Sequence, residues 1–143
     1  MRLKIGANPL SHTESSRARG AMPAGDSHIE LILGDCVVQE NWTSAGNTGY
    51  SGKSYNIYNT APERWEQRWV DNAGGNIFFY GGLKDAIMDS WTDELPQADG
   101  KKLKRHLQFL KLGPDTVRQF SQGSNDNGKT PFVEYDFTYS RKK

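Results

Sequence analysis

The feature that most constrains this chain is a succession of turn-forming clusters, which recur roughly every 8 to 15 residues. Clear examples are SAGNTGYSG at residues 44–52, NAGG at 72–75 and SNDNGK at 124–129. Between these clusters, apolar and polar residues alternate, as they do in strands with one buried face. The pattern predicts an all-β fold, an antiparallel meander of about eight strands that closes into a barrel.

Composition agrees with strands and sets the domain boundaries. In 143 residues there are 15 glycines and 11% aromatics, whereas only 35% of residues are hydrophobic, which suits a strand-rich domain better than a helix bundle. Residues 1–26 show no periodicity, so we expect an irregular N-terminal arm with at most a short strand at 3–5. Residues 27–143 are predicted to form a single β-barrel domain.

The segment TAPERWEQRWVDNAGG, at residues 60–75, fits two structures. A helix would use Thr60 and Glu63 as a capping box and would place Trp65 and Trp69 four residues apart. A strand would put both tryptophans and Gln67 on one face. Capping contributes on the order of 1 kcal/mol, whereas losing a central strand would uncover aromatic faces that contribute several times as much. We therefore predict a strand.

Two further segments bear on the strand pattern. KKLKRHLQFLKL, at residues 101–112, fits a helical stripe and a strand face equally. In HIELILGDCVVQENWT, Gly34 and Asp35 interrupt the alternation as a bulge or tight bend would. Beyond them Cys36, Glu40 and Trp42 share a face, so the single cysteine is expected to be a small buried side chain.

Charge and motif content argue against several classes of function. Eighteen basic and seventeen acidic residues give no electrostatic reason to expect nucleic acid or an anionic membrane as partner. No apolar run is long enough to span a bilayer, and the first residues lack the apolar core of a secretory signal, so we expect a cytoplasmic protein. His12, His28 and His106 do not have metal-ligand spacing. We expect no metal and no cofactor.

Five short segments follow one another in a distinctive order. They are IELILGDCVVQENW (29–42), GKSYNIY (52–58), WEQRWVDNAG (65–74), VRQFSQGSNDNGKT (117–130) and DFTYSR (136–141). This order resembles a group of small bacterial lipocalin-like proteins without an assigned activity, over roughly residues 28–141. The resemblance implies an antiparallel barrel of the calycin type and says almost nothing about chemistry.

The chain departs from that group at its N-terminus. Such proteins carry a first strand with a Gly-x-Trp element before the segment that matches Ile29, and this chain has no such element there. The barrel could then be incomplete at its N-terminal edge, or residues 1–20 could supply a substitute strand. An unpaired edge invites pairing with a second chain, so we predict a homodimer formed through that edge.

Alternation also predicts a ligand site. We expect Trp42, Trp65 and Trp69 to face inward together with Tyr58. Alternation along each strand then brings the polar side chains of Glu40, Asn56 and Gln67 into the interior as well. Aromatic walls with a few convergent polar groups are typical of small-molecule sites. The predicted ligand-binding residues are Glu40, Trp42, Asn56, Tyr58, Trp65, Gln67, Trp69 and Arg118.

Glu40 is the central candidate, because a carboxylate among indoles needs a cation or a raised pKa. Arg105 and Arg118 are its candidate partners, and a structural Glu–Arg brace is the simplest role for such a pair. We expect a small, partly apolar ligand. The alternatives are a calycin-like isomerase, cyclase or decarboxylase that uses Glu40 as general acid or base, and a structural module that dimerises or binds a protein. No catalytic residue can be named.

Overall fold

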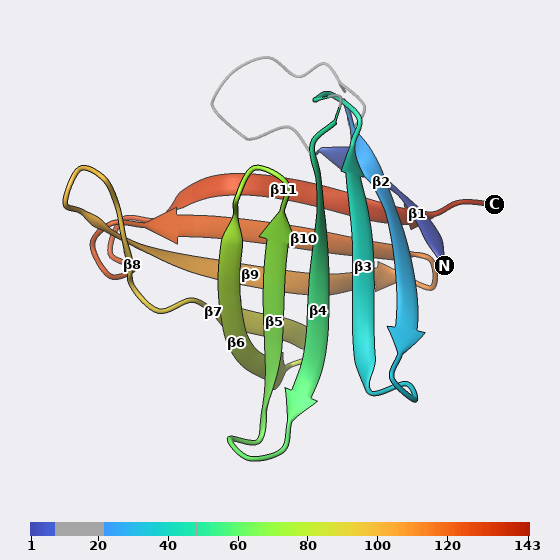
Figure 1. The fold of residues 1–143 in the computed structure, drawn as a ribbon, viewed down its shortest axis with the longest axis horizontal. Helices are drawn as coiled ribbons and strands as arrows, with labels where there is room; N and C mark the ends of the chain where they lie inside the picture. The colour runs from blue at the N-terminus through green and yellow to red at the C-terminus, as the bar shows by residue number, and fades with distance from the viewer. Residues whose placement is uncertain (8–21, 48) are drawn as a thin grey trace.

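The computed structural model describes residues 1–7, 22–47 and 49–143, and these form an antiparallel β-barrel (Figure 1). The strands are β1 (Arg2–Ala7), β2 (Met22–Ile32), β3 (Val37–Ser44), β4 (Ser51–Asn59), β5 (Arg64–Asp71), β6 (Asn76–Lys84), β7 (Ile87–Trp91), β8 (Leu95–Pro96), β9 (Lys102–Gly113), β10 (Thr116–Ser124) and β11 (Phe132–Arg141). The part of the chain that the structure describes contains no helix. The predicted all-β antiparallel meander is confirmed.

The strand ladders run around the barrel. Of the eleven strands, all but the two-residue β8 pair with a neighbour on each side, which gives ten strands in the wall instead of the expected eight or so. The order follows the chain from β1 to β7, continues through β9, β10 and β11, and returns to β1. The barrel is consistent with a calycin-like fold.

The disputed segments are strands. Residues 64–71 form β5, whose register with β4 places Trp65 opposite Tyr58 and Trp69 opposite Ser54. Residues 102–113 form β9, with Leu103 and Leu107 buried on the inner face. In both places the neighbouring strands decide the structure, because a helix would satisfy its own backbone groups but would leave the facing edges of the adjacent strands without partners.

The bend at Gly34 and Asp35 is a hairpin turn rather than an interruption within one strand. Leu33, Gly34 and Asp35 all have positive φ, at 54°, 67° and 65°, and the turn joins β2 to β3. Consequently Cys36 lies in the turn and is exposed. The expectation of a buried cysteine on the Glu40 face was wrong, because the turn reverses the chain before the inward alternation begins.

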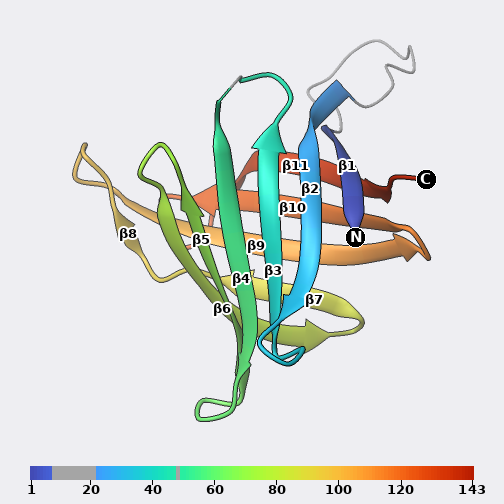
Figure 2. The same cartoon turned by 45° about the vertical axis from the view of Figure 1, so that its right-hand side comes forward.

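The N-terminal edge of the barrel is paired. Strand β1 lies between β2 and β11 and forms antiparallel ladders with both (Figures 1 and 2). Strands β1 and β2 both begin within residues 1–26, where the sequence predicted an arm; residues 8–21 lie outside the described residues. Residues 2–7 thus supply the substitute strand, and the barrel is not incomplete there. Homodimer formation stays a prediction, but the open N-terminal edge from which it was argued is paired in the structure.

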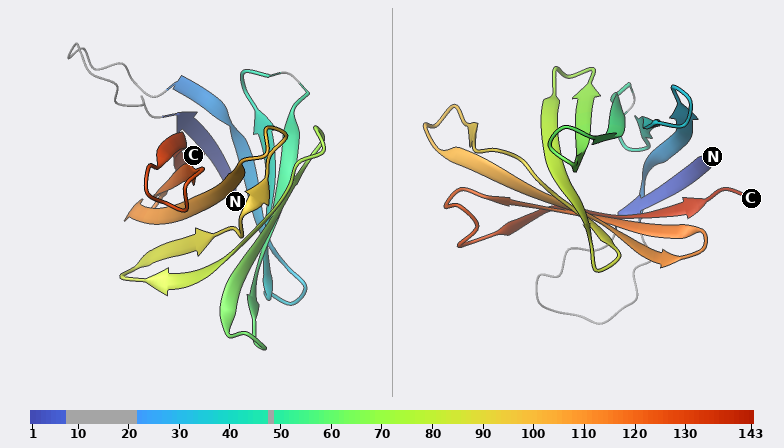
Figure 3. Two further views of the ribbon diagram at one scale, coloured as in Figure 1. Left: turned by 90° about the vertical axis from the view of Figure 1, so that its left-hand side faces the viewer. Right: turned by 90° about the horizontal axis from the view of Figure 1, so that it is seen from below.

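One seam of the wall is not sealed. Strand β7 pairs only with residues 80–84 of β6, so within the described ranges residues 76–79 have a strand partner only on the β5 side. Across this seam lie β8 and the start of β9, where Leu95 pairs with Leu103. Figure 3 shows the β5–β6 turn and the β8–β9 end diverging from each other. The hydrogen-bonded wall is therefore interrupted along residues 76–79.

The interior is polar for a barrel of this size. Its buried residues include several serines and two glutamines beside a few large apolar side chains. They include Ser27, Ser54, Ser90, Ser121, Gln67, Gln119, Phe79, Leu103, Leu107 and Tyr139. Small hydroxyl side chains occupy positions where bulky aliphatic residues would fill a packed barrel, so space is left inside.

The described residues form no helix of the length and apolar character that crossing a membrane would require.

Candidate functional site

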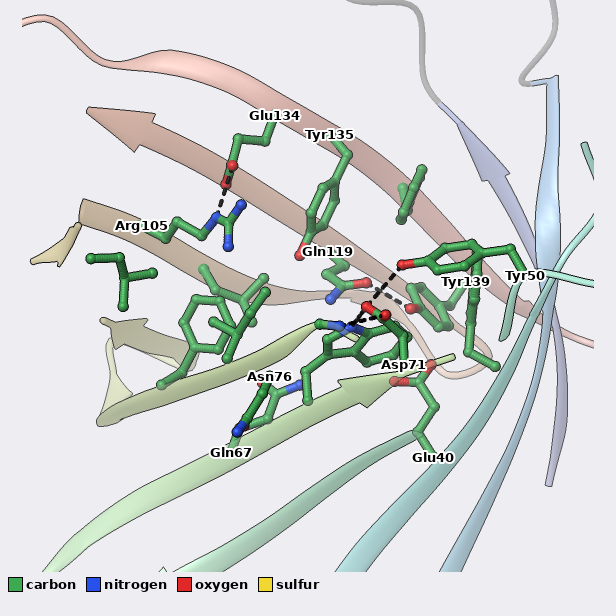
Figure 4. Close-up of a pocket in the computed structure, with 18 of the residues that line it drawn as sticks. Glu40, Tyr50, Gln67, Asp71, Asn76, Arg105, Gln119, Glu134, Tyr135 and Tyr139 are labelled. Atoms are coloured by element: carbon green, nitrogen blue, oxygen red, sulfur yellow. Dashed lines mark hydrogen bonds and ion pairs between the residues drawn. The ribbon is translucent and has the colours of Figure 1, made fainter. Parts of the chain in front are cut away.

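The interior contains a cavity of about 690 Å³ that reaches the unsealed seam (Figure 4). Its walls come from β3 and the β3–β4 connection, from β5 and β6, and from β8 to β11. The lining residues are Glu40, Trp42, Tyr50, Gln67, Trp69, Asp71, Gly75, Asn76, Ile77, Phe79, Leu95, Pro96, Arg105, Leu107, Gln119, Glu134, Tyr135, Phe137 and Tyr139. This volume lies within the range of small-molecule pockets.

Glu40 is the most buried acidic group of the cavity, with 6% of its surface exposed. It projects from β3 toward the interior (Figure 4). Ser27 Oγ on β2 donates to Glu40 Oε1 at 2.7 Å, and Ser54 Oγ on β4 donates to Glu40 Oε2 at 3.2 Å. One serine from each neighbouring strand therefore fixes the carboxylate. The expected partners, Arg105 and Arg118, do not contact it.

Asp71 forms a second acidic position at the end of β5. Its side chain accepts hydrogen bonds from Trp69 Nε1 at 2.9 Å, from Tyr50 Oη at 3.2 Å and from the backbone amides of Ala73 and Gly75. The Trp69 hydrogen bond, followed by the Gly75 amide, lowers the pKa of this carboxyl from its usual 3.8. Asp71 is therefore ionised at neutral pH.

Two tyrosines of β11 project into the cavity between these acids and β10. Tyr139 Oη donates to Gln119 Oε1 at 2.6 Å, and both side chains are buried. Burial, and then the negative charge of Glu40, raise the pKa of the Tyr139 phenol well above its usual 10.0. Desolvation likewise raises the pKa of Tyr135 to about 12. Both phenols are neutral hydrogen-bonding groups at neutral pH.

The single guanidinium of the lining is already paired. Arg105 Nε on β9 donates to Glu134 Oε1 at 2.9 Å, and Ser121 donates to Glu134 Oε2 at 3.0 Å. Glu134 and Tyr135 are adjacent in sequence yet both line the cavity. A register shift in the β10–β11 ladder explains this, because Ser121 pairs with Tyr135 and Gln122 with Val133, which leaves Glu134 as the extra residue of a β-bulge.

Aromatic rings form one wall of the cavity. Trp42 meets Trp69 edge to face, with ring centroids 6.1 Å apart, and meets Tyr50 in the same way at 5.4 Å. Gly52 makes this packing possible, because a Cβ at that position would lie 2.2 Å from the Trp69 ring. The two indoles and Tyr50 thus lie beside the acidic groups of the cavity.

The structure brings together half of the residues predicted for the site. Glu40, Trp42, Gln67 and Trp69 line the cavity, whereas Asn56, Tyr58, Trp65 and Arg118 do not. Arg118 has its own bidentate pair with Asp136, at 2.8 and 2.7 Å, and its guanidinium lies over Phe120. Arg118 precedes Gln119 in β10, and adjacent residues of a strand point to opposite faces. Because Gln119 points inward, Arg118 points away from the cavity.

Tyr58 and Trp65 lie away from the cavity for a different reason. They form an edge-to-face pair at 5.8 Å near the β4–β5 turn, and Tyr58 is 44% exposed. Trp65 is on the same face as Trp69, but four residues of strand separate them by roughly 13 Å. Asn56 lies on β4 between Ser54 and Tyr58, and its side-chain amide donates to the Val38 carbonyl and to Ser54 Oγ.

Several cavity residues were not predicted, although the sequence held a signal for some of them. Alternation continued from Trp69 places Asp71 on the inner face, and the aromatic face of β11 includes Tyr135, Phe137 and Tyr139. Arg105, expected only as a candidate partner of Glu40, lies on the same face of β9 as the buried Leu103 and Leu107. Glu134 had no such signal, because only the bulge turns it inward.

No protein-family model matches this sequence, and a search of curated proteins also finds no match.

Proposed function

We propose that this protein is a lipocalin-like barrel that binds a small, partly apolar molecule in the cavity beside the seam. The observation that carries the proposal is the cavity itself, about 690 Å³ in volume and lined by aromatic rings with carboxylates, amides and phenols among them. Aromatic walls provide apolar contact area, and a few convergent polar groups orient a ligand. The buried serines support the same proposal, since larger side chains at those positions would fill the space.

An acid–base enzyme has a narrower basis. Glu40 and Tyr139 are neighbours in the cavity, so a carboxyl group and a phenol lie together where acid–base chemistry would take place. A phenol whose pKa lies well above 10.0 is a weak acid at neutral pH, however, and transfers a proton poorly. The site is better suited to forming hydrogen bonds with a bound molecule than to transferring protons to it.

The test is a titration with a neutral, environment-sensitive dye such as 6-propionyl-2-dimethylaminonaphthalene. Saturable blue-shifted emission of the dye, with simultaneous quenching of tryptophan fluorescence, is expected. The quenching should fall strongly in Trp69→Phe, because Trp69 lines the cavity. Trp65→Phe is the matched control and should keep it, because Trp65 lies outside the lining. A dye that neither saturates nor quenches would oppose the proposal.

A further inference from the structure

Among the described residues the most buried carboxylate, that of Glu40, has no cationic partner. At three places in the wall an arginine pairs with a carboxylate whose side chain is 12–16% exposed: Arg105–Glu134, Arg118–Asp136 and Arg64–Glu66. Glu40 is 6% exposed, yet within the described ranges no Lys, Arg or His lies within ion-pair distance of it. Two serine hydroxyls orient the carboxylate and leave its charge uncompensated.

The cavity as a whole has the same imbalance. Three carboxylates line it, those of Glu40, Asp71 and Glu134, against the single guanidinium of Arg105. Because Glu134 is bonded to Arg105 at 2.9 Å, the remaining charge is negative and belongs to Glu40 and Asp71. Bringing a cation into this part of the cavity would offset the desolvation cost of the buried carboxylates.

The walls near these acids are suited to a cation as well. Trp42, Trp69 and Tyr50 form two edge-to-face contacts, and the ring of Tyr139 packs against Trp42 in the same interior cluster. Indole and phenol rings carry negative potential on their faces, and aromatic cages of this composition recognise ammonium groups. Trp69 directs its N–H toward Asp71, so that group is not available to repel a cation.

We propose that the ligand of this cavity is an organic cation, whose ammonium group binds between the Glu40 carboxylate and the rings of Trp42, Trp69 and Tyr139. The apolar part of such a ligand extends along Ile77, Phe79 and Leu107 toward the seam. This inference rests on the proposed function and adds the chemical class of the ligand. Glu40 provides charge selectivity, and the aromatic rings provide contact area.

The test compares three probes of one shape and different charge. Benzyltrimethylammonium, neopentylbenzene and phenylmethanesulfonate share a benzyl group and a tetrahedral head, with charges of +1, 0 and −1. Each is titrated into the unmodified protein while tryptophan fluorescence is recorded. The cation should bind about tenfold or more tightly than the hydrocarbon, and the sulfonate should bind most weakly. This comparison needs no variant.

A variant pair then assigns the selectivity to Glu40. In Glu40→Gln, the preference for the cation over neopentylbenzene should nearly disappear. Glu66→Gln removes an equal charge from the outer face of β5, where Glu66 pairs with Arg64, and should keep the preference. Circular dichroism checks that both variants are folded. If Glu40→Gln does not fold, the three-probe comparison on the unmodified protein decides alone.

Each outcome separates the two proposals. Equal binding of the cation and the hydrocarbon would overturn the cation inference and leave the cavity function standing. Tightest binding of the sulfonate would also overturn it, and would indicate a site dominated by Arg105. Failure of all three probes, together with the neutral dye, would overturn both.

Discussion

Ser54 on β4 lies directly opposite Glu40 on β3, and its hydroxyl donates to Glu40 Oε2 at 3.2 Å. Ser54 is 1% exposed and Glu40 is 6% exposed, so water does not easily replace this hydrogen bond. Ser27 supplies the second hydroxyl from the other side, at 2.7 Å. The cross-strand register therefore holds a carboxylate in place inside the barrel with neutral groups alone.

Removing one of these hydroxyls should measurably destabilise the barrel. Ser54→Ala leaves a buried carboxylate oxygen without its donor, at a cost of about 1–3 kcal/mol in the free energy of unfolding. Urea unfolding followed by tryptophan fluorescence measures the difference. Ser51→Ala is the matched control, since Ser51 is on the same strand but lies opposite Thr43. Equal stability of the two variants would contradict the prediction.

Asp71 should make the barrel more stable at neutral pH than in acid. Its pKa is lowered by the Trp69 N–H and the Gly75 amide, so folding favours the ionised form. A lowered pKa means that this contribution is complete above the usual value of 3.8 and is lost as pH falls through the lower value of the folded state. Asp71→Asn should therefore be less stable at neutral pH.

The decisive measurement for Asp71 is how the free energy of unfolding of the two proteins depends on pH. In urea unfolding at a series of pH values, the difference between the unmodified protein and Asp71→Asn should narrow as pH falls below 3.8. The variant should also shift the fluorescence of Trp69, whose Nε1 loses its charged acceptor. A stability difference that does not change with pH would show that Asp71 acts through packing rather than through its charge.

Gly52 should be intolerant of even a methyl group. A Cβ at this position would lie 2.2 Å from Trp69 Cζ2, so Gly52→Ala must displace the indole. Overpacking of this kind costs roughly 1–3 kcal/mol, and the displaced Trp69 should also weaken probe binding in the cavity. Gly82→Ala is the control, because nothing lies within 4 Å of its added Cβ. Thermal unfolding and probe titration of both variants check the prediction.

The period-two alternation of strands explains what the sequence could predict. Gln67 and Trp69 share the inner face of β5 as expected, and the aromatic residues of β11 share a face as well. Alternation specifies a face but not a level along the barrel axis. For that reason Trp65 was grouped with Trp69, although it packs with Tyr58 near the β4–β5 turn.

Other parts of the site could not be predicted because they depend on pairing between distant strands. The bulge that turns Glu134 inward exists only in the β10–β11 register, and it gives Arg105 its partner. Once Arg105 is paired with Glu134 and Arg118 with Asp136, neither arginine is left for Glu40. The sequence left closure by a substitute strand from residues 1–20 as one of two alternatives, and it could not choose between them because the ladder that decides joins residues 3–7 to residues 137–141 at the far end of the chain.

Tyr139 provides the last prediction, which concerns alkaline pH. Its hydroxyl donates to the buried Gln119 at 2.6 Å, so Tyr139→Phe should cost about 1–3 kcal/mol at neutral pH. Burial and the charge of Glu40 hold the pKa of this phenol well above 10.0 in the folded state. A raised pKa means that the stabilising contribution is complete below the unfolded-state value of 10.0 and declines as pH rises beyond it.

The two effects of Tyr139 can be separated in one experiment. Above pH 10.0 the unfolded phenol ionises while the folded one stays neutral, so this group should lower the stability of the unmodified protein by up to about 1.4 kcal/mol per pH unit. Tyr139→Phe lacks that slope, and its stability deficit should shrink as pH rises. Urea unfolding at successive alkaline pH values, with tyrosinate absorbance recorded in parallel, measures both. Parallel stability curves for the two proteins would mean that Tyr139 ionises as readily inside the barrel as outside it, and the phenol would then not be shielded beside Glu40.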